Sequence, residues 1–284
     1  MKPEDVIRLK ELLPTTLGSD EIREQLAGDI LRRSIFSARM ASVPYLAKIR
    51  EVCTAIAAGS INAADARAQL LPILEQMGHS PQDEGGLKNP ASIRRLNLIL
   101  DTQTQMASSV ARLSEQTEAT INLFPAWELT RLETRSFPRA DWMQRWTAAG
   151  NSVNWEGAVK RQMIALKSSP IWAALGNGVG GFTDTLGNPY PPFAYSSGLD
   201  WLDVDRETCE KLGLVKGEAA SRRLKGEAAS RRLKGEAASR RLKGEAASSP
   251  LVPERPSLSP SERDIADAIK RYGFPSISDG LEVV

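Results

Sequence analysis

The sequence predicts a mainly α protein with an α+β, loop-rich second half, then a flexible repeat linker and a short C-terminal helix. Apolar residues recur at helical spacing through the first 120 residues. All six tryptophans lie between residues 127 and 201, among many glycines and prolines, and a nonapeptide repeats from 216 to 248. With 41% hydrophobic and 25% charged residues, the 284-residue chain is neither a collagen, a mucin-like stalk nor wholly disordered.

These shifts in composition divide the chain into four segments. We expect a helical domain, an aromatic-rich α+β domain, the repeat with a Pro-rich linker, and a short C-terminal helix with a tail. Their ranges are 1–120, 121–213, 214–256 and 257–284.

The first segment predicts several amphipathic helices. One covers 4–13 and is stopped by Pro14, and another covers 20–33. An antiparallel pair follows over 44–59 and 62–78, with a glycine closing each helix.

A long helix is predicted after a polar loop. Asn89 is its expected cap, Pro90 fits the first helical position, and the helix runs to about residue 122. Its apolar stripe has one gap, at Gln103, and consists of Leu96, Ile99, Met106, Val110 and Leu113.

The run from Arg94 to Gln116, RRLNLILDTQTQMASSVARLSEQ, resembles a helix of the Mu F-like phage minor head proteins. That family has an arginine–leucine pair, a turn rich in Thr, Asn and Gln, and then small residues. The positions that match in order are Arg95, Leu96, Thr102, Gln103, Gln105 and Ala107. The helical pair upstream is also similar, so the resemblance covers about residues 30–120.

The resemblance implies a structural protein of the phage or prophage head, present in few copies and not an enzyme. It would act near the portal, with portal and capsid proteins as partners, during capsid assembly and DNA packaging. It would need no cofactor, and would be found in the bacterial host cytoplasm and then in the virion. The family's C-terminal motif, Asp-x-Arg-Thr-Arg with a following His, is largely absent: only Glu133, Thr134 and Arg135 echo it.

The middle segment is irregular. Alternating polar and apolar residues predict a strand over 126–134, and short helices are expected over 139–149 and 156–168. The Gly-, Pro- and aromatic-rich stretch that follows should form an ordered loop, because so many aromatic rings need burial.

Sequence patterns for catalysis are scarce. The glycines of a formal G-x-G-x-x-G are Gly176, Gly178 and Gly181, but no strand precedes them and no helix follows, so we interpret them as a helix end and turns. The single histidine, His79, lies in a polar loop. HExxH, G-x-S-x-G and Walker A motifs are absent from the sequence.

A small acidic cluster contains Asp200, Asp203, Asp205 and Glu207. Its simpler explanation is that Asp205 caps a helix that runs through Leu212. The alternative is a divalent cation site, and hence a metal-dependent hydrolase, because carboxylate oxygens suit Mg²⁺ or Ca²⁺.

Residues 216–248 consist of three copies of KGEAASRRL followed by KGEAAS. This segment contains ten basic and four acidic side chains, whereas the whole chain has a net charge of +2. Nine residues per repeat place successive leucines on opposite faces of a helix, so no apolar stripe forms. The segment is therefore a solvated spacer or a non-specific contact to DNA phosphates. In the second case the chain is an accessory nucleic-acid-binding protein, and the contacts come from Arg222, Arg223, Arg231, Arg232, Arg240 and Arg241.

The C-terminal segment predicts one more helix, which begins at the capping box Ser259–Glu262. Its apolar face, with Ile265 and Ile269, suits either a partner's groove or the chain's own domain.

The two cysteines are expected as free thiols, Cys53 in the core, although one disulfide with Cys209 is the alternative. The acidic start is unlike a signal peptide, and no apolar run approaches the ~20 residues of a membrane span, so we expect no membrane association.

Overall fold

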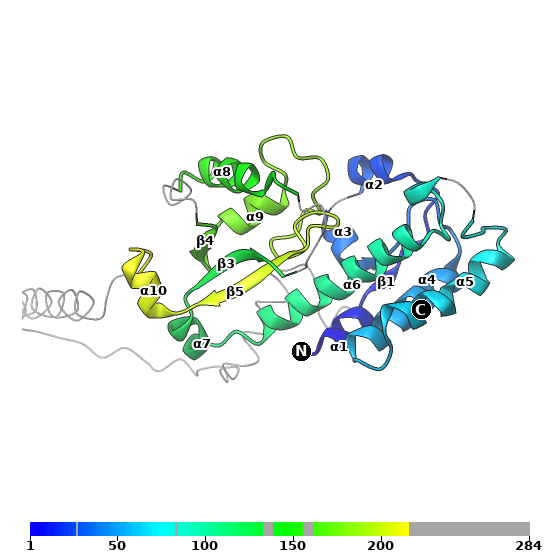
Figure 1. Cartoon of the computed structure of the whole chain (residues 1–284), viewed down its shortest axis with the longest axis horizontal. Helices are drawn as coiled ribbons and strands as arrows, with labels where there is room; N and C mark the ends of the chain where they lie inside the picture. The colour runs from blue at the N-terminus through cyan, green and yellow to red at the C-terminus, as the bar shows by residue number, and fades with distance from the viewer. Residues whose placement is uncertain (27, 83–84, 133–138, 156–161, 216–284) are drawn as a thin grey trace, which may run out of the picture.

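The structure, a computed structural model, describes residues 1–26, 28–82, 85–132, 139–155 and 162–215. Within these ranges the chain is mainly α-helical with a small antiparallel sheet in its second half, which confirms the predicted fold class. Figure 1 shows the N-terminal helices on one side, the sheet and its helices on the other, and the long helix α6 (Ile93–Ser114) between them. Among the described helices, none has the length and apolar character that crossing a membrane requires.

The predicted helix over 4–13 stops early. Helix α1 covers only Pro3–Arg8, and strand β1 (Glu11–Leu12) then pairs in parallel with β2 (Ser34–Ile35). This correction has a tertiary cause, because the backbone of β1 is hydrogen-bonded to a segment more than 20 residues away instead of to its own preceding turn.

The predicted helix over 20–33 is two helices, α2 (Ser19–Gln25) and α3 (Gly28–Arg33). Leu26 ends α2 with an extended backbone, φ −108° and ψ 132°, which breaks the helical hydrogen-bond series.

The antiparallel pair is confirmed as α4 (Val43–Ala57) and α5 (Ala63–Gln76). Asn62 caps α5 as predicted, because its side chain accepts hydrogen bonds from the backbone N–H of Ala64 and Asp65. Gly59, with φ 71°, follows α4 in a conformation that favours glycine.

The long helix is present but shorter than predicted. After the 3-10 turn η1 (Gly86–Lys88), the cap of α6 is Ser92, which accepts a hydrogen bond from the backbone of Arg95. Asn89 instead closes a turn by accepting from the backbone of Ala91. Helix α6 ends at Ser114, and Thr117 caps a separate helix, α7 (Glu118–Leu123).

The sheet of the second half has the strand order β4–β3–β5, all antiparallel: Ile164–Leu166, Ala126–Arg131 and Leu199–Val204. Strand β3 confirms the predicted strand, but the predicted helix over 156–168 is wrong in its described part, because β4 lies there. Pairing with β3 gives β4 backbone partners that a three-residue segment lacks by itself.

Three short helices accompany the sheet: α8 (Trp142–Ser152), α9 (Ile171–Gly176) and α10 (Arg206–Lys211). Figure 1 shows α8 and α9 together on one side of the sheet and α10 near α7 at one end.

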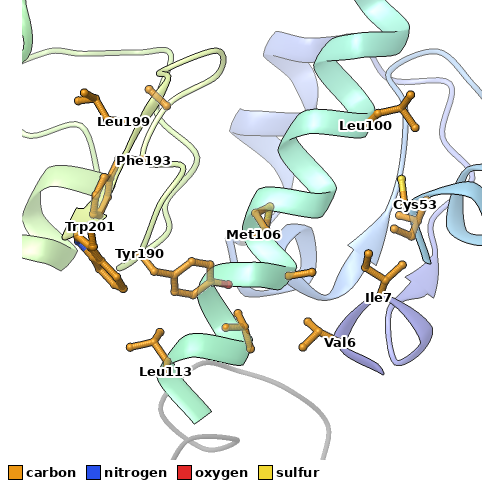
Figure 2. Close-up of a cluster of buried hydrophobic side chains, with 14 of the residues drawn as sticks. Val6, Ile7, Cys53, Leu100, Met106, Leu113, Tyr190, Phe193, Leu199 and Trp201 are labelled. Atoms are coloured by element: carbon orange, nitrogen blue, oxygen red, sulfur yellow. The ribbon is translucent and has the colours of Figure 1, made fainter. Parts of the chain in front are cut away.

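One hydrophobic cluster includes side chains from both halves of the described chain. Figure 2 shows α6 at its centre, with Val6 and Ile7 on one side and Phe193 and Trp201 on the other. The rings of Trp127 and Trp201 stack with their centroids 3.7 Å apart. The division into domains 1–120 and 121–213 stays a prediction, but any boundary between them crosses this shared core.

The repeat, its six arginines, the Pro-rich linker and the predicted C-terminal helix lie outside the described residues, as does the Glu133–Arg135 echo of the family motif.

Candidate functional site

The six residues that carry the family resemblance all lie on α6 but do not share one role. Leu96 and Ala107 are fully buried in the hydrophobic cluster. Arg95, Thr102 and Gln103 are polar residues that are also buried, with exposed fractions of 8%, 9% and 4%. Buried polar groups destabilise a fold unless they are hydrogen-bonded, so each needs a partner.

Arg95 connects two loops to the start of α6. Its guanidinium donates to the backbone carbonyls of Leu87 and Lys88 at 3.3 and 3.2 Å, and on the other side to Ser37 Oγ at 2.8 Å and to the carbonyl of Ala38. Burial, the largest effect, lowers the pKa of Arg95. Within the described residues, Arg95 donates to three backbone carbonyls and one hydroxyl and has no carboxylate at ion-pair distance.

Gln103, the gap in the predicted stripe, accepts a hydrogen bond from a buried lysine. Lys10 is 2% exposed, and its Nζ lies 2.7 Å from Gln103 Oε1. Burial lowers the pKa of Lys10 to about 8 and raises the pKa of the nearby Cys53 thiol to about 12. The polar residue that interrupts the apolar stripe therefore accepts a hydrogen bond from the buried amino group of Lys10, which the sequence pattern did not reveal.

Helix α6 also holds the outer strand of the sheet. Gln105 Nε2 donates to the carbonyl of Leu199 at 2.8 Å, and Arg112 Nη1 donates to the carbonyl of Trp201 at 2.8 Å. These carbonyls belong to β5, which pairs with β3 on its other side. Side chains of α6 thus provide the hydrogen-bond donors that the backbone of a further strand would otherwise provide to these carbonyls of β5.

A pocket of about 280 Å³ lies beside α6, between α2, α3, η1 and the loop from Asp184 to Tyr195. Three resemblance residues, Arg95, Thr102 and Gln103, contribute to its lining. Its apolar wall contains Ile22, Leu31, Phe36, Leu98, Ile99 and Met106. A concave, mainly apolar site with a few convergent polar groups is the usual form of a binding pocket, and this is the candidate functional site.

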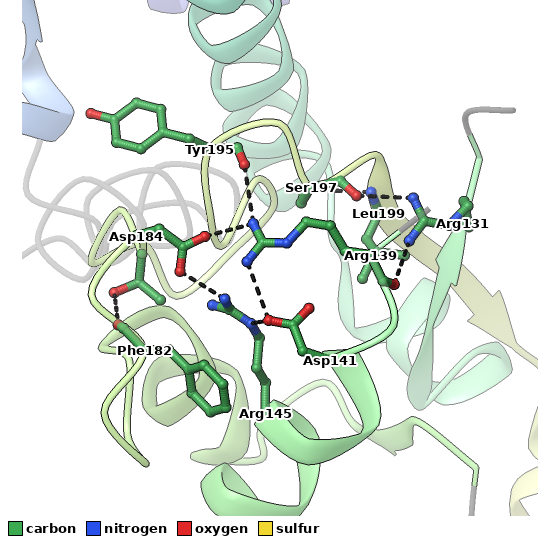
Figure 3. Close-up of polar contacts among 10 residues, drawn as sticks. Arg131, Arg139, Asp141, Arg145, Phe182, Asp184, Tyr195, Ser197 and Leu199 are labelled. Atoms are coloured by element: carbon green, nitrogen blue, oxygen red, sulfur yellow. Dashed lines mark hydrogen bonds and ion pairs between the residues drawn. The ribbon is translucent and has the colours of Figure 1, made fainter. Parts of the chain in front are cut away.

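A four-residue charge network, drawn in Figure 3, borders this pocket at Asp184. Arg145, with a side chain 4% exposed, pairs with Asp141 at 2.8 Å and with Asp184 at 2.7 Å. Arg139 pairs with the same two carboxylates at 3.2 and 2.5 Å. The Arg145 guanidinium also lies 4.2 Å from the ring centroid of Phe182.

The two carboxylates of the network are stabilised in their charged form. Burial, the largest single effect, raises the pKa of Asp141 and Asp184, but the hydrogen bonds and charges of Arg145 and Arg139 outweigh it. The pKa of each carboxyl group therefore lies below the ordinary aspartate value. The network joins α8 to the loop that forms one wall of the pocket.

The acidic residues of β5 do not converge. Asp200 pairs with Arg112 of α6 at 3.5 Å, and Asp203 pairs with Lys167 at 2.7 Å. Asp205 caps α10 as predicted, accepting from the backbone N–H of Thr208 at 2.8 Å. Within the described residues, no group of three or more His, Cys, Asp or Glu side chains is arranged to hold a metal ion.

The formal G-x-G-x-x-G is a helix end and turns, as interpreted. Gly176 is the last residue of α9, and a Cβ there would lie 1.7 Å from the carbonyl oxygen of Asn188. Gly178 and Gly181 have φ values of 72° and 89°. The cysteines Cys53 and Cys209 are buried free thiols.

Sequence reasoning missed Lys10 and the charge network. Asp141 and Arg145 stand four residues apart, a spacing that favours ion pairs on a helix. Lys10 and Asp184 gave no such signal, because their partners lie 93 and 39 residues away.

Comparison with known proteins returns no match: neither a family model, nor a curated protein, nor a solved structure is significantly similar to this chain.

Proposed function

We propose that this chain is a structural minor head protein of a phage or prophage that acts near the portal in capsid assembly and DNA packaging. The observation that carries the proposal is the ordered pattern Arg95, Leu96, Thr102, Gln103, Gln105 and Ala107, preceded by a helical pair like that of the Mu F-like family.

The polar residues of the pattern do not lie on the solvent side of α6. In an ordinary amphipathic helix, residues such as Arg, Thr and Gln lie on the solvent side. Here Arg95, Thr102 and Gln103 are all buried, and Arg95 and Gln103 have specific hydrogen bonds. The polar side chains of Arg95 and Gln103 therefore have a structural role in this chain, and the proposal itself depends on the sequence pattern.

The proposed partners are the portal protein and capsid proteins, and the role is assembly and not catalysis. The chain would associate with the portal in the host cytoplasm and remain in the virion. No cofactor is part of the proposal.

Co-purification tests it. The full chain is co-expressed with the tagged portal protein encoded in the same genome segment, and the eluate is passed through gel filtration. We expect the chain to elute with the portal, and mass spectrometry of purified heads to find few copies of it. The major capsid protein alone is the control bait. Failure to associate with the portal or any capsid component would overturn the proposal.

A second candidate function is non-specific DNA binding through the repeat, carried by the ten basic and four acidic residues between 216 and 248. Phosphate contacts by arginine make affinity fall steeply with salt. We would replace the six repeat arginines by Gln in the full chain. The matched control replaces Leu224, Leu233 and Leu242 by Ala and keeps every charge.

If the repeat binds DNA, only the arginine variant loses affinity, and its remaining binding depends less on salt. Equal DNA binding by both variants would leave the repeat as a spacer.

A further inference from the structure

The pocket beside α6 is large enough for a substantial apolar group. Its volume is about 280 Å³, whereas an engineered cavity of about 150 Å³ accommodates benzene. At its edge Leu87 is 49% exposed, so the apolar lining continues onto the protein surface. An apolar side chain presented by another polypeptide would fill the pocket and cover this edge.

The polar lining has an excess of positive charge. Within the described residues, neither Arg32 nor Arg95 has a carboxylate at ion-pair distance, and the pocket's Asp184 is already paired with two other arginines. Arg32 lines the pocket and donates from Nη1 to the backbone carbonyl of Gly187 at 2.9 Å, a neutral acceptor that leaves its charge without a carboxylate partner within the described residues.

We propose that this pocket binds an apolar side chain together with a neighbouring carboxylate, presented by an acidic segment of a partner protein. The apolar group occupies the space lined by Ile22, Ile99 and Met106, and the carboxylate approaches Arg32. A charge-assisted hydrogen bond to a guanidinium is stronger than a neutral one, so the acidic residue determines which apolar segments bind. The inference does not depend on the partner being a head protein.

The test uses the full chain with ¹³C-methyl-labelled methionine, because the Met106 side chain lines the pocket and is 5% exposed. The probe is N-acetyl-leucyl-aspartyl-leucinamide. A second peptide replaces its aspartate by asparagine, and decanoate serves as a free apolar carboxylate. Titration is followed by NMR at the Met106 methyl signal.

Two variants separate the charge from the apolar cavity. Arg32→Gln removes the unpaired guanidinium, and the matched control is Arg33→Gln, the next residue of α3, which pairs with Asp29 and does not line the pocket. Ile99→Trp fills the cavity without changing a charge. Thermal unfolding checks that each variant is folded.

We expect the aspartate peptide to shift the Met106 signal and to bind about tenfold more weakly to the Arg32→Gln variant, but unchanged to the Arg33→Gln variant. The asparagine peptide should bind the wild-type chain about tenfold more weakly as well, and Ile99→Trp should abolish the shift. The proposal is overturned if the two peptides bind equally, if Arg32→Gln has no effect, or if decanoate binds and the aspartate peptide does not.

Discussion

Replacing Arg145 by Met removes the most buried charge of the network and leaves the carboxylates of Asp141 and Asp184 with fewer partners. Arg145 has a 4% exposed side chain and ion pairs of 2.8 and 2.7 Å to Asp141 and Asp184. Removing one partner of a buried ion pair costs about 3–5 kcal/mol. Both carboxylates are about one-third exposed, and Arg139 still contacts them, so we expect about 3 kcal/mol, the lower end of that range.

Urea unfolding followed by tryptophan fluorescence measures this loss, because all six tryptophans lie between residues 127 and 201, the part of the chain that contains the network. In a thermal scan the same change should lower the Tm by about 6–12 °C. The control is Arg139→Met, whose side chain is 29% exposed and whose loss should cost about 1 kcal/mol.

The effect also has a defined pH dependence. The pKa of both aspartates is lowered in the folded chain, so their stabilisation is present above the unfolded aspartate pKa of about 3.9 and is lost as the pH falls through the folded value. The difference between the wild type and the Arg145→Met variant should therefore shrink below about pH 4. Two results would contradict this account of the network: Arg145→Met costing no more than Arg139→Met, or a stability difference between the wild type and Arg145→Met that stays constant as the pH falls below about 4.

Three further predictions concern buried positions. Burial lowers the pKa of Lys10 to about 8, so the charged form destabilises the folded chain at neutral pH. The unfolding free energy of the wild type should therefore rise by up to about 3 kcal/mol relative to that of Lys10→Met between pH 7 and pH 10, and parallel pH–stability curves would contradict this. Arg95→Met should cost about 2–4 kcal/mol in urea unfolding because four donated hydrogen bonds to two loops are lost; a loss under about 1 kcal/mol would show that water replaces them. Gly176→Ala should cost about 3 kcal/mol or more, because its Cβ would meet the backbone of Asn188, whereas Gly28→Ala, which has only an arginine side chain nearby at 3.4 Å, should be tolerated.

The helices with strong local signals could be predicted from the sequence. α4 and α5 combine an apolar stripe, a capping side chain and a closing glycine, and all three act within a few residues of each other. The same holds for Asp205 and α10, since a cap depends only on the next three residues. The predictions failed where the partner is distant: β1 and β4 exist because they pair with other strands.

Much the same division applies to the candidate site. The sequence by itself determined that a long amphipathic helix would carry the pattern from Arg95 to Ala107, because periodicity and residue order are local properties. Only the tertiary structure decided that Gln103 faces a buried lysine, that Asp184 joins the network around Arg145, and that a pocket lies between them. These features require side chains from segments tens of residues apart to meet, and the order of residues along a chain does not specify such meetings.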